Sequence, residues 1–190
     1  WKFFSTLRSV RRFRKLETVP VARRLQSVAS VADLRDISKR RLPGGVFDYI
    51  DGAAEDEVTL RRNSEAYNSV EFKPRVFRDV SNISVASSLL GKPLSFPLVL
   101  APTGFGRIAH SQGELAVARA AERANIPYTL STLGTRSIED IAEVSNGRKW
   151  FQVYVWRDRD LVKEMRERAS ASNYEAIAIR VDTPVLGRAG

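Results

Sequence analysis

The sequence contains no cysteine and one histidine, His110. Without cysteine there can be no disulfide, no thiolate nucleophile and no cysteine-ligated metal site. A single histidine excludes a histidine-cluster metal centre, so we expect no bound metal. No apolar run approaches the roughly 20 residues that a bilayer-spanning helix needs. The longest apolar run, residues 97–102, suits a buried strand.

Positive charge is concentrated at the N-terminus. Residues 1–25 carry eight Lys or Arg and one acid, Glu17, and so hold +7 of the net charge of +9. The remainder is nearly balanced, so residues 1–30 form a basic arm. Phe3, Leu7 and Val10 recur in it at helical spacing. Three interpretations stay open: a disordered or locally packed extension, peripheral attachment to an anionic membrane, and nucleic-acid binding. No nucleic-acid motif follows, so we expect no nucleic-acid partner.

A strand-then-helix pattern occurs four times between residues 97 and 190. The predicted strands are residues 98–102, 128–132, 150–155 and 176–182. This alternation is typical of a parallel sheet with helical crossovers. Four such units are half of an eight-unit barrel, which typically has roughly 250 residues. The expected fold is therefore α/β, the N-terminal half of a (β/α)8 TIM barrel occupying residues 97–190.

Residues 31–96 are predicted to form a helical segment that precedes the barrel. Helices are expected at residues 31–41, 46–50 and 55–68, followed by a hairpin within residues 84–96 that would close the barrel bottom. Two barrel helices are expected to begin with capping boxes, one from Ser111 to Glu114 and one from Ser137 to Asp140.

The predicted strands have apolar middles and polar ends. In barrels of this class the chemistry lies at the C-terminal ends of the strands. The switch from apolar to polar residues therefore predicts a ligand site at the barrel mouth. The strand ends are Pro102-Thr103-Gly104, Ser131-Thr132-Leu133, Gln152-Val153-Tyr154 and Val181-Asp182-Thr183-Pro184.

These strand ends, together with one upstream segment, resemble the motifs of a known protein family. From about Ile37 onward the sequence resembles the FMN-dependent α-hydroxy-acid dehydrogenase/oxidase family, which includes L-lactate dehydrogenase and glycolate oxidase. Each motif is weak alone, but five occur in order on the predicted strand ends. They are residues 47–56 (FDYIDGAAED), 101–104 (APTG), 130–132 (LST), 151–155 (FQVYV) and 181–184 (VDTP).

The resemblance implies FMN as cofactor and hydride transfer from a 2-hydroxy acid to the flavin while a base takes the hydroxyl proton. By position, Pro102, Thr103 and Gly104 would line the flavin ring, and Ser131 and Gln152 would hydrogen-bond its polar edge. The resemblance also assigns residues to the substrate and to the base. Tyr49 and Tyr154 would hold the substrate carboxylate and hydroxyl, and Asp182 would orient and charge-stabilise the base, a histidine.

Plain structural interpretations stand beside these roles. The two tyrosines could be amphipathic core residues, and Asp182 could cap a turn. His110 is interpreted as structural, because the family's base belongs to a later strand; we expect this chain to lack the half that carries it. The sequence departs from the family in two places: Arg180 replaces a flavin-contacting Thr, and Ala189 falls where the family has its carboxylate-binding Arg, next to Arg188.

The expected activity is FMN-dependent oxidation of an L-2-hydroxy acid, most simply L-lactate to pyruvate. Leu133 stands where glycolate-specific relatives have Trp, which leaves room for a methyl group. We expect a quinone or other carrier as electron acceptor, a homo-oligomer at full length, and a cytoplasmic location, peripheral at the inner face of the membrane. The alternatives are a non-catalytic half-barrel, favoured by unpaired sheet edges, and a different FMN barrel.

Overall fold

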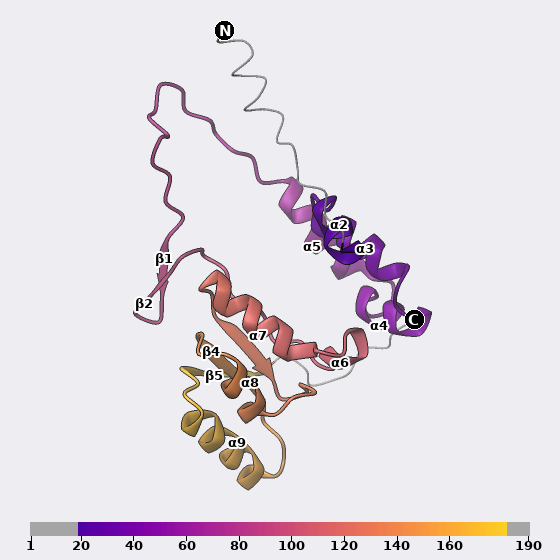
Figure 1. Ribbon diagram of the computed structural model, residues 1–190, viewed down its shortest axis with the longest axis vertical. Coiled ribbons are helices and arrows are strands. Elements are labelled where there is room, and N and C mark those ends of the chain that lie inside the picture. Colours follow the sequence, from indigo (N-terminus) through magenta and orange to yellow (C-terminus); the bar gives the residue numbers. More distant parts are fainter. Residues whose placement is uncertain (1–18, 182–190) are drawn as a thin grey trace. The chain divides into compact units, whose positions relative to one another are not determined.

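The computed structural model describes residues 19–181. Figure 1 labels the helices and strands along the chain. The chain divides into two compact units, and the division falls between Phe47 and Asp48. Each unit is described by itself below. The barrel elements and most of the predicted site residues belong to the second unit.

The N-terminal unit is helical. It contains α2 (Pro20–Gln26), α3 (Val31–Lys39) and the first half of α4 (Gly44–Asp51). A capping box begins α3: the Ser30 hydroxyl accepts from the Asp33 N–H (3.2 Å), and the Asp33 carboxylate accepts from the Ser30 N–H (2.9 Å). These bonds, with one from Ala29, hold the pKa of Asp33 below its usual value. The helix predicted from residue 31 is confirmed.

The second unit begins with the second half of α4, followed by α5 (Val58–Asn68) and a two-stranded hairpin, β1 (Ser87–Leu89) and β2 (Lys92–Leu94). Leu90 and Gly91 connect the strands with φ angles of 52° and 72°. Two consecutive positive φ angles match the twist of a tight hairpin, and glycine adopts one without steric cost. The hairpin predicted within residues 84–96 is thus confirmed.

A three-stranded parallel sheet forms the centre of the second unit. Its strands are β3 (Tyr128–Ser131), β4 (Lys149–Tyr154) and β5 (Ala176–Arg180), in that order. The helices α8 (Ile138–Val144) and α9 (Arg159–Ala171) connect them, and α6 (Gly106–Ala109) and α7 (Gly113–Ala124) precede β3. The predicted strand–helix alternation is confirmed, as is the capping box from Ser137 to Asp140, with bonds of 3.0 and 3.2 Å.

The strand predicted at residues 98–102 is wrong as an extended element. Only Leu100 pairs with the sheet, in a single parallel bridge to Tyr128. Its N–H donates to the Pro127 carbonyl and its carbonyl accepts from the Thr129 N–H, both at 3.0 Å. Pro102, two residues after Leu100 and on the same side of the chain, has no N–H with which to extend this ladder.

The core lies between one face of the sheet and the helices α7, α8 and α9. Side chains alternate along each strand, so only every second residue points to that core. The buried core residues include Leu130, Ile141, Phe151, Val153 and Ala169. The alternating residues on the other face include Thr129, Ser131, Trp150 and Gln152, and this second face is more polar.

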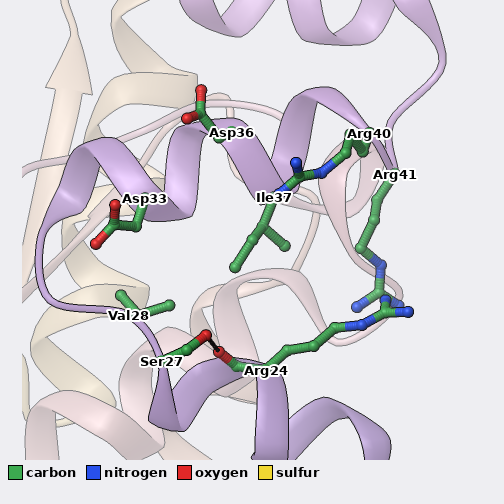
Figure 2. Close-up of a pocket in the computed structure, with 8 residues that line it drawn as sticks. All are labelled: Arg24, Ser27, Val28, Asp33, Asp36, Ile37, Arg40 and Arg41. Atoms are coloured by element: carbon green, nitrogen blue, oxygen red, sulfur yellow. Dashed lines mark hydrogen bonds between the residues drawn. The ribbon is translucent and has the colours of Figure 1, made fainter.

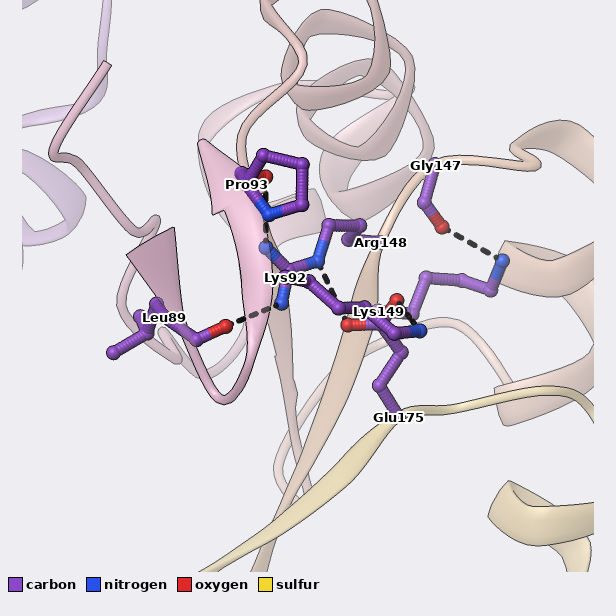
Figure 3. A network of polar contacts seen from close by, with 7 residues as sticks. All are labelled: Leu89, Lys92, Pro93, Gly147, Arg148, Lys149 and Glu175. Carbon is purple, nitrogen blue, oxygen red and sulfur yellow. Dashed lines mark hydrogen bonds and ion pairs between the residues drawn. The ribbon is translucent and has the colours of Figure 1, made fainter. Parts of the chain in front are cut away.

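Ion pairs attach the hairpin to the amino-terminal ends of the central strands. The Glu175 carboxylate, just before β5, accepts from Lys92 Nζ (2.7 Å) and Arg148 Nε (2.8 Å) (Figure 3). The Arg148 guanidinium also donates to the Leu89 carbonyl at 3.2 Å. The next residue, Lys149, is buried and donates to the Ser145 and Gly147 carbonyls. The hairpin therefore lies opposite the strand ends that carry the predicted site.

Candidate functional site

Ser131 and Gln152 lie side by side at the ends of β3 and β4. They are register partners, and both are buried. The Ser131 hydroxyl donates to Oε1 of Gln152 at 3.0 Å and accepts from the Leu133 N–H at 3.1 Å. The other end of the amide, Nε2 of Gln152, has no acceptor among the residues described. A buried amide N–H without a partner is costly, so this atom points to an acceptor supplied by a ligand.

Thr132 fixes the backbone around this pair. Its N–H donates to the Gln152 carbonyl at 3.0 Å, and its hydroxyl donates to the same oxygen in a short bond. The hydroxyl oxygen also accepts from the Tyr154 N–H at 3.3 Å. One threonine therefore holds the last residues of β4 in register with the end of β3.

Tyr154 and Arg180 form the next pair toward the open end of the sheet. They are register partners on β4 and β5. Nη1 of Arg180 donates to the Tyr154 hydroxyl at 2.9 Å, and the guanidinium carbon lies 5.3 Å from the centre of the tyrosine ring. Tyr154 is half-buried and Arg180 is exposed. The pair therefore presents a phenol and a fixed positive charge at the edge of the site.

The segment after Leu100 approaches β3 closely at Gly104. A Cβ built at Gly104 would lie 3.2 Å from the Leu133 Cβ, closer than ordinary contact. The Phe105 N–H donates to the Leu133 carbonyl at 2.9 Å. Tyr49 stands edge-on to the Phe105 ring, with centroids 6.4 Å apart. Tyr49 thus reaches this segment from α4, and its side chain stays mostly exposed.

Glu114 connects the two loops that flank the site. The predicted capping box from Ser111 to Glu114 is wrong: α7 begins at Gly113 without a side-chain cap. Instead, the buried Glu114 carboxylate accepts from the Gly106 N–H (2.9 Å), the Thr135 N–H (2.8 Å) and the Thr135 hydroxyl (2.7 Å). Burial alone would raise the pKa of Glu114, but these hydrogen bonds outweigh it and lower the pKa.

An open hollow of about 440 Å³ lies over the site, lined by Pro102, Gln152, Ile179, Arg180 and Val181. Its lining includes both Gln152, whose Nε2 has no acceptor among the described residues, and the positively charged Arg180. A hollow of this volume is in the range of small-molecule sites.

A larger hollow, about 550 Å³, belongs to the N-terminal unit and lies between α2 and α3 (Figure 2). Arg24, Arg40 and Arg41 line one side, and the ends of Arg24 and Arg41 point toward one another. On the other side, the Asp33 carboxylate is occupied by the capping box of α3. None of the predicted flavin or substrate residues lines this hollow, so we place the candidate site at the strand ends.

The sequence model of the FMN-dependent dehydrogenase family matches residues 38–189. The chain belongs to this family. It is 46% identical over 166 residues to the "Putative L-lactate dehydrogenase" of Mycobacterium tuberculosis, a match that covers 87% of this chain and 40% of that protein. It is 41% identical over 161 residues to glycolate oxidase of Spinacia oleracea, which covers 85% of this chain and 44% of that protein.

Solved structures of the family share the fold. A soluble mutant of the membrane-associated (S)-mandelate dehydrogenase from Pseudomonas putida is 38% identical, with a TM-score of 0.83 over 86% of this chain and 46% of that one. Mandelate oxidase bound to a difluorinated phenylpropionic acid is 39% identical, with a TM-score of 0.81 over 85% of this chain and 49% of that one. The predicted TIM-barrel half is thereby confirmed. The chain spans less than half the length of the curated relatives that it matches here.

FMN is the cofactor of this family, as predicted. Several residues of the described part fit it. A flavin presents carbonyl oxygens and ring nitrogens along one edge, which are acceptors for the buried Nε2 of Gln152. Pro102 lines the same hollow as Gln152.

The structure brings four of the predicted site residues together: Pro102, Ser131, Gln152 and Tyr154. Their roles toward flavin and substrate stay predictions. Thr103 is exposed beside Pro102. Asp182, the predicted partner of the base, lies outside the described residues, as do Arg188 and Ala189.

His110 makes a local contact that suits its structural interpretation. Its Nδ1 accepts from the Gln112 N–H at 3.1 Å, within the turn between α6 and α7.

Sequence reasoning missed the roles of Thr132 and Glu114. The position of Thr132 directly after Ser131 was visible in the sequence, but its register with Gln152 was not. None of the described helices is both long and apolar enough to cross a membrane.

Proposed function

We propose that the protein oxidises an L-2-hydroxy acid, with L-lactate as substrate and pyruvate as product. The observation that carries this proposal is the buried Nε2 of Gln152, which has no acceptor in the described residues, in a residue that lines the same hollow as Pro102. Bound FMN would supply the hydride acceptor for oxidation at the substrate Cα.

The residues of this chain would bind the flavin and orient the substrate. Gln152 would donate to the polar edge of the flavin, with Ser131 holding its amide in place. Gly104 would permit backbone contact with the ring. The Tyr154 hydroxyl would orient the substrate, and Tyr49, from α4, would also hold it. Asp182 would stabilise the protonated base.

The choice of lactate rests on Leu133. Relatives bear the names of both lactate and glycolate enzymes, so family membership alone leaves the substrate open. Leu133 adjoins Gly104, and its side chain is 37% exposed at the site. A leucine leaves more space than the tryptophan of glycolate-specific relatives, which favours a substrate with a methyl group.

Two measurements test the proposal. The purified full-length protein should show a flavin absorption spectrum and reduce a dye when L-lactate is added. Residues 1–190 alone should not turn over lactate, because their only histidine is His110, in a structural turn. A full-length protein that binds no flavin would instead support a non-catalytic role. Turnover by residues 1–190 alone would show that the assignment of the base is wrong.

We further propose that electrons pass to a membrane quinone or similar carrier. The basic charge of residues 1–25 supports a position at the inner face of an anionic membrane. One structural neighbour is a mutant of a membrane-associated mandelate dehydrogenase. Stopped-flow mixing of the lactate-reduced protein with air-saturated buffer or a soluble quinone tests this. Equally fast reoxidation by oxygen would make the protein an oxidase.

A further inference from the structure

Arg180 places a permanent positive charge inside the candidate site. It ends β5 and faces Tyr154 across the sheet, with a 2.9 Å hydrogen bond to the tyrosine hydroxyl. It also lines the hollow that contains Gln152. Other residues lining that hollow, Pro102, Ile179 and Val181, are uncharged. Among the described residues, Arg180 is therefore the one cation that a ligand filling the hollow would meet.

The geometry of the pair suits a carboxylate. A guanidinium is planar and presents its N–H donors as a fork that matches the two oxygens of a carboxylate. The Tyr154 oxygen accepts from Arg180, so its own O–H proton can be donated to a further group. Stacking on the tyrosine ring at 5.3 Å restrains the guanidinium before any ligand arrives.

We propose that Arg180 binds the carboxylate of the 2-hydroxy acid, with Tyr154 as its positioning partner. The inference rests on the proposed function. It assigns to β5 a role in selecting acids over neutral alcohols. Arg180 stands where the family usually has a flavin-contacting threonine. In this proposal, its longer, charged side chain contacts the substrate instead of the flavin.

The test compares an acid with its neutral analogue. Arg180→Gln and Arg180→Lys in the full-length flavin-loaded protein are assayed with L-lactate and with L-lactamide, which has the same size and no charge. For Arg180→Gln we expect the KM for lactate to rise on the order of 10- to 100-fold, because one pair of charge-assisted hydrogen bonds to the carboxylate is lost. The KM for lactamide should change less than about threefold, and Arg180→Lys should recover part of the loss.

A binding measurement accompanies the kinetics. Pyruvate is titrated calorimetrically into wild type and each variant, and guanidinium chloride is added to Arg180→Gln to test for rescue of lactate turnover. Arg159→Gln, an exposed arginine at the start of α9, serves as the matched control and should behave as wild type.

The outcomes separate the two proposals. Equal rises in KM for lactate and lactamide would show that Arg180 only positions Tyr154, and would overturn the inference. Unchanged pyruvate affinity in Arg180→Gln would do the same. A wild-type protein that binds pyruvate through Arg180 but oxidises no 2-hydroxy acid would contradict the proposed function and leave the carboxylate site supported.

Discussion

The hydroxyl of Ser131 donates to Oε1 of Gln152, and the other end of the buried amide, Nε2, has no acceptor among the described residues. Because the carbonyl oxygen is held by Ser131, the amide must present its N–H donors to whatever occupies the site. The register between β3 and β4 places the two residues opposite one another. Parallel strand pairing thus leaves a buried amide donor without an acceptor among the described residues.

Replacement of Gln152 should weaken flavin binding. For Gln152→Leu we expect the Kd for FMN to rise roughly 10- to 100-fold, because one or two hydrogen bonds of a buried donor are lost. FMN titration followed by flavin fluorescence measures it. Thr129→Val is the control, since Thr129 is buried on the same face two residues before Ser131. Equal loss in both variants would indicate general damage to the sheet.

Tyr154→Phe should lower turnover while flavin stays bound. The phenol oxygen contacts Arg180 and not the Ser131–Gln152 pair, so its removal leaves the flavin contacts intact. We expect kcat for lactate to fall about 10- to 100-fold with an unchanged flavin content per protein. Tyr174→Phe is the control: its hydroxyl donates to the Ile138 carbonyl at 3.0 Å, so it should lower stability and leave turnover per flavin unaltered.

Glu114→Ala should destabilise the fold strongly. It removes the acceptor of three hydrogen bonds and leaves the partly buried donors of Gly106 and Thr135 unsatisfied. We expect a loss of roughly 3 kcal/mol or more in the free energy of unfolding, measured by urea denaturation of the full chain. Glu122→Ala on the same helix is the control, because its carboxylate accepts one bond, from the exposed Asn146 N–H. Similar losses of stability in the two variants would contradict the role of Glu114 in connecting the two loops.

The same carboxylate predicts a pH dependence. The pKa of Glu114 is lower in the folded state than its ordinary value of about 4.3. Its contribution to stability is therefore complete above that ordinary value and is lost as the pH falls through the folded pKa. Urea midpoints between pH 6 and pH 3 should drop less steeply in Glu114→Gln than in wild type. Parallel curves would show that Glu114 does not contribute to acid sensitivity.

Leu133→Trp should shift selectivity from lactate toward glycolate. The indole would fill the space beside Gly104 that the methyl group of lactate needs. We expect the ratio of kcat/KM for lactate over glycolate to fall about 10-fold or more, the usual cost of one misplaced methyl group in a pocket. Leu133→Met, which nearly conserves volume, should keep the ratio. An unaltered ratio in the tryptophan variant would remove Leu133 from the substrate pocket.

Reversal of charge at Arg24 and Arg41 should weaken binding to anionic vesicles. Both line the hollow between α2 and α3, and each basic residue near such a surface contributes about 1 kcal/mol. Co-sedimentation with phosphatidylserine vesicles should fall at least 10-fold in the double glutamate variant. It should also fall with added salt, since charges are screened beyond roughly 8–10 Å at physiological ionic strength. As a control, a double glutamate variant at Arg159 and Arg166 of α9 carries the same charge change and should bind anionic vesicles as wild type does. Equal binding of the wild-type protein to neutral and anionic vesicles would refute the electrostatic attraction.

Local patterns predicted much of this fold. The helices at residues 31–39 and 138–144 begin at serine capping boxes, because those bonds join residues three apart and need no tertiary partner. The central strands were predicted within two residues at each end, since apolar runs bounded by polar residues mark buried strands. The same pattern failed at residues 98–102, where only Leu100 pairs with the sheet and Pro102 has no N–H with which to extend the ladder.

The amino-acid sequence by itself determined the order of helices and strands and the residue types at the strand ends, because both depend on short-range periodicity. Only the tertiary structure decided which polar atoms meet. Glu114 has the spacing of a helix cap, yet its carboxylate joins two loops that are 29 residues apart in sequence, from Gly106 to Thr135. The contact of Arg180 with Tyr154 likewise follows from strand register, a long-range relationship that no local pattern encodes.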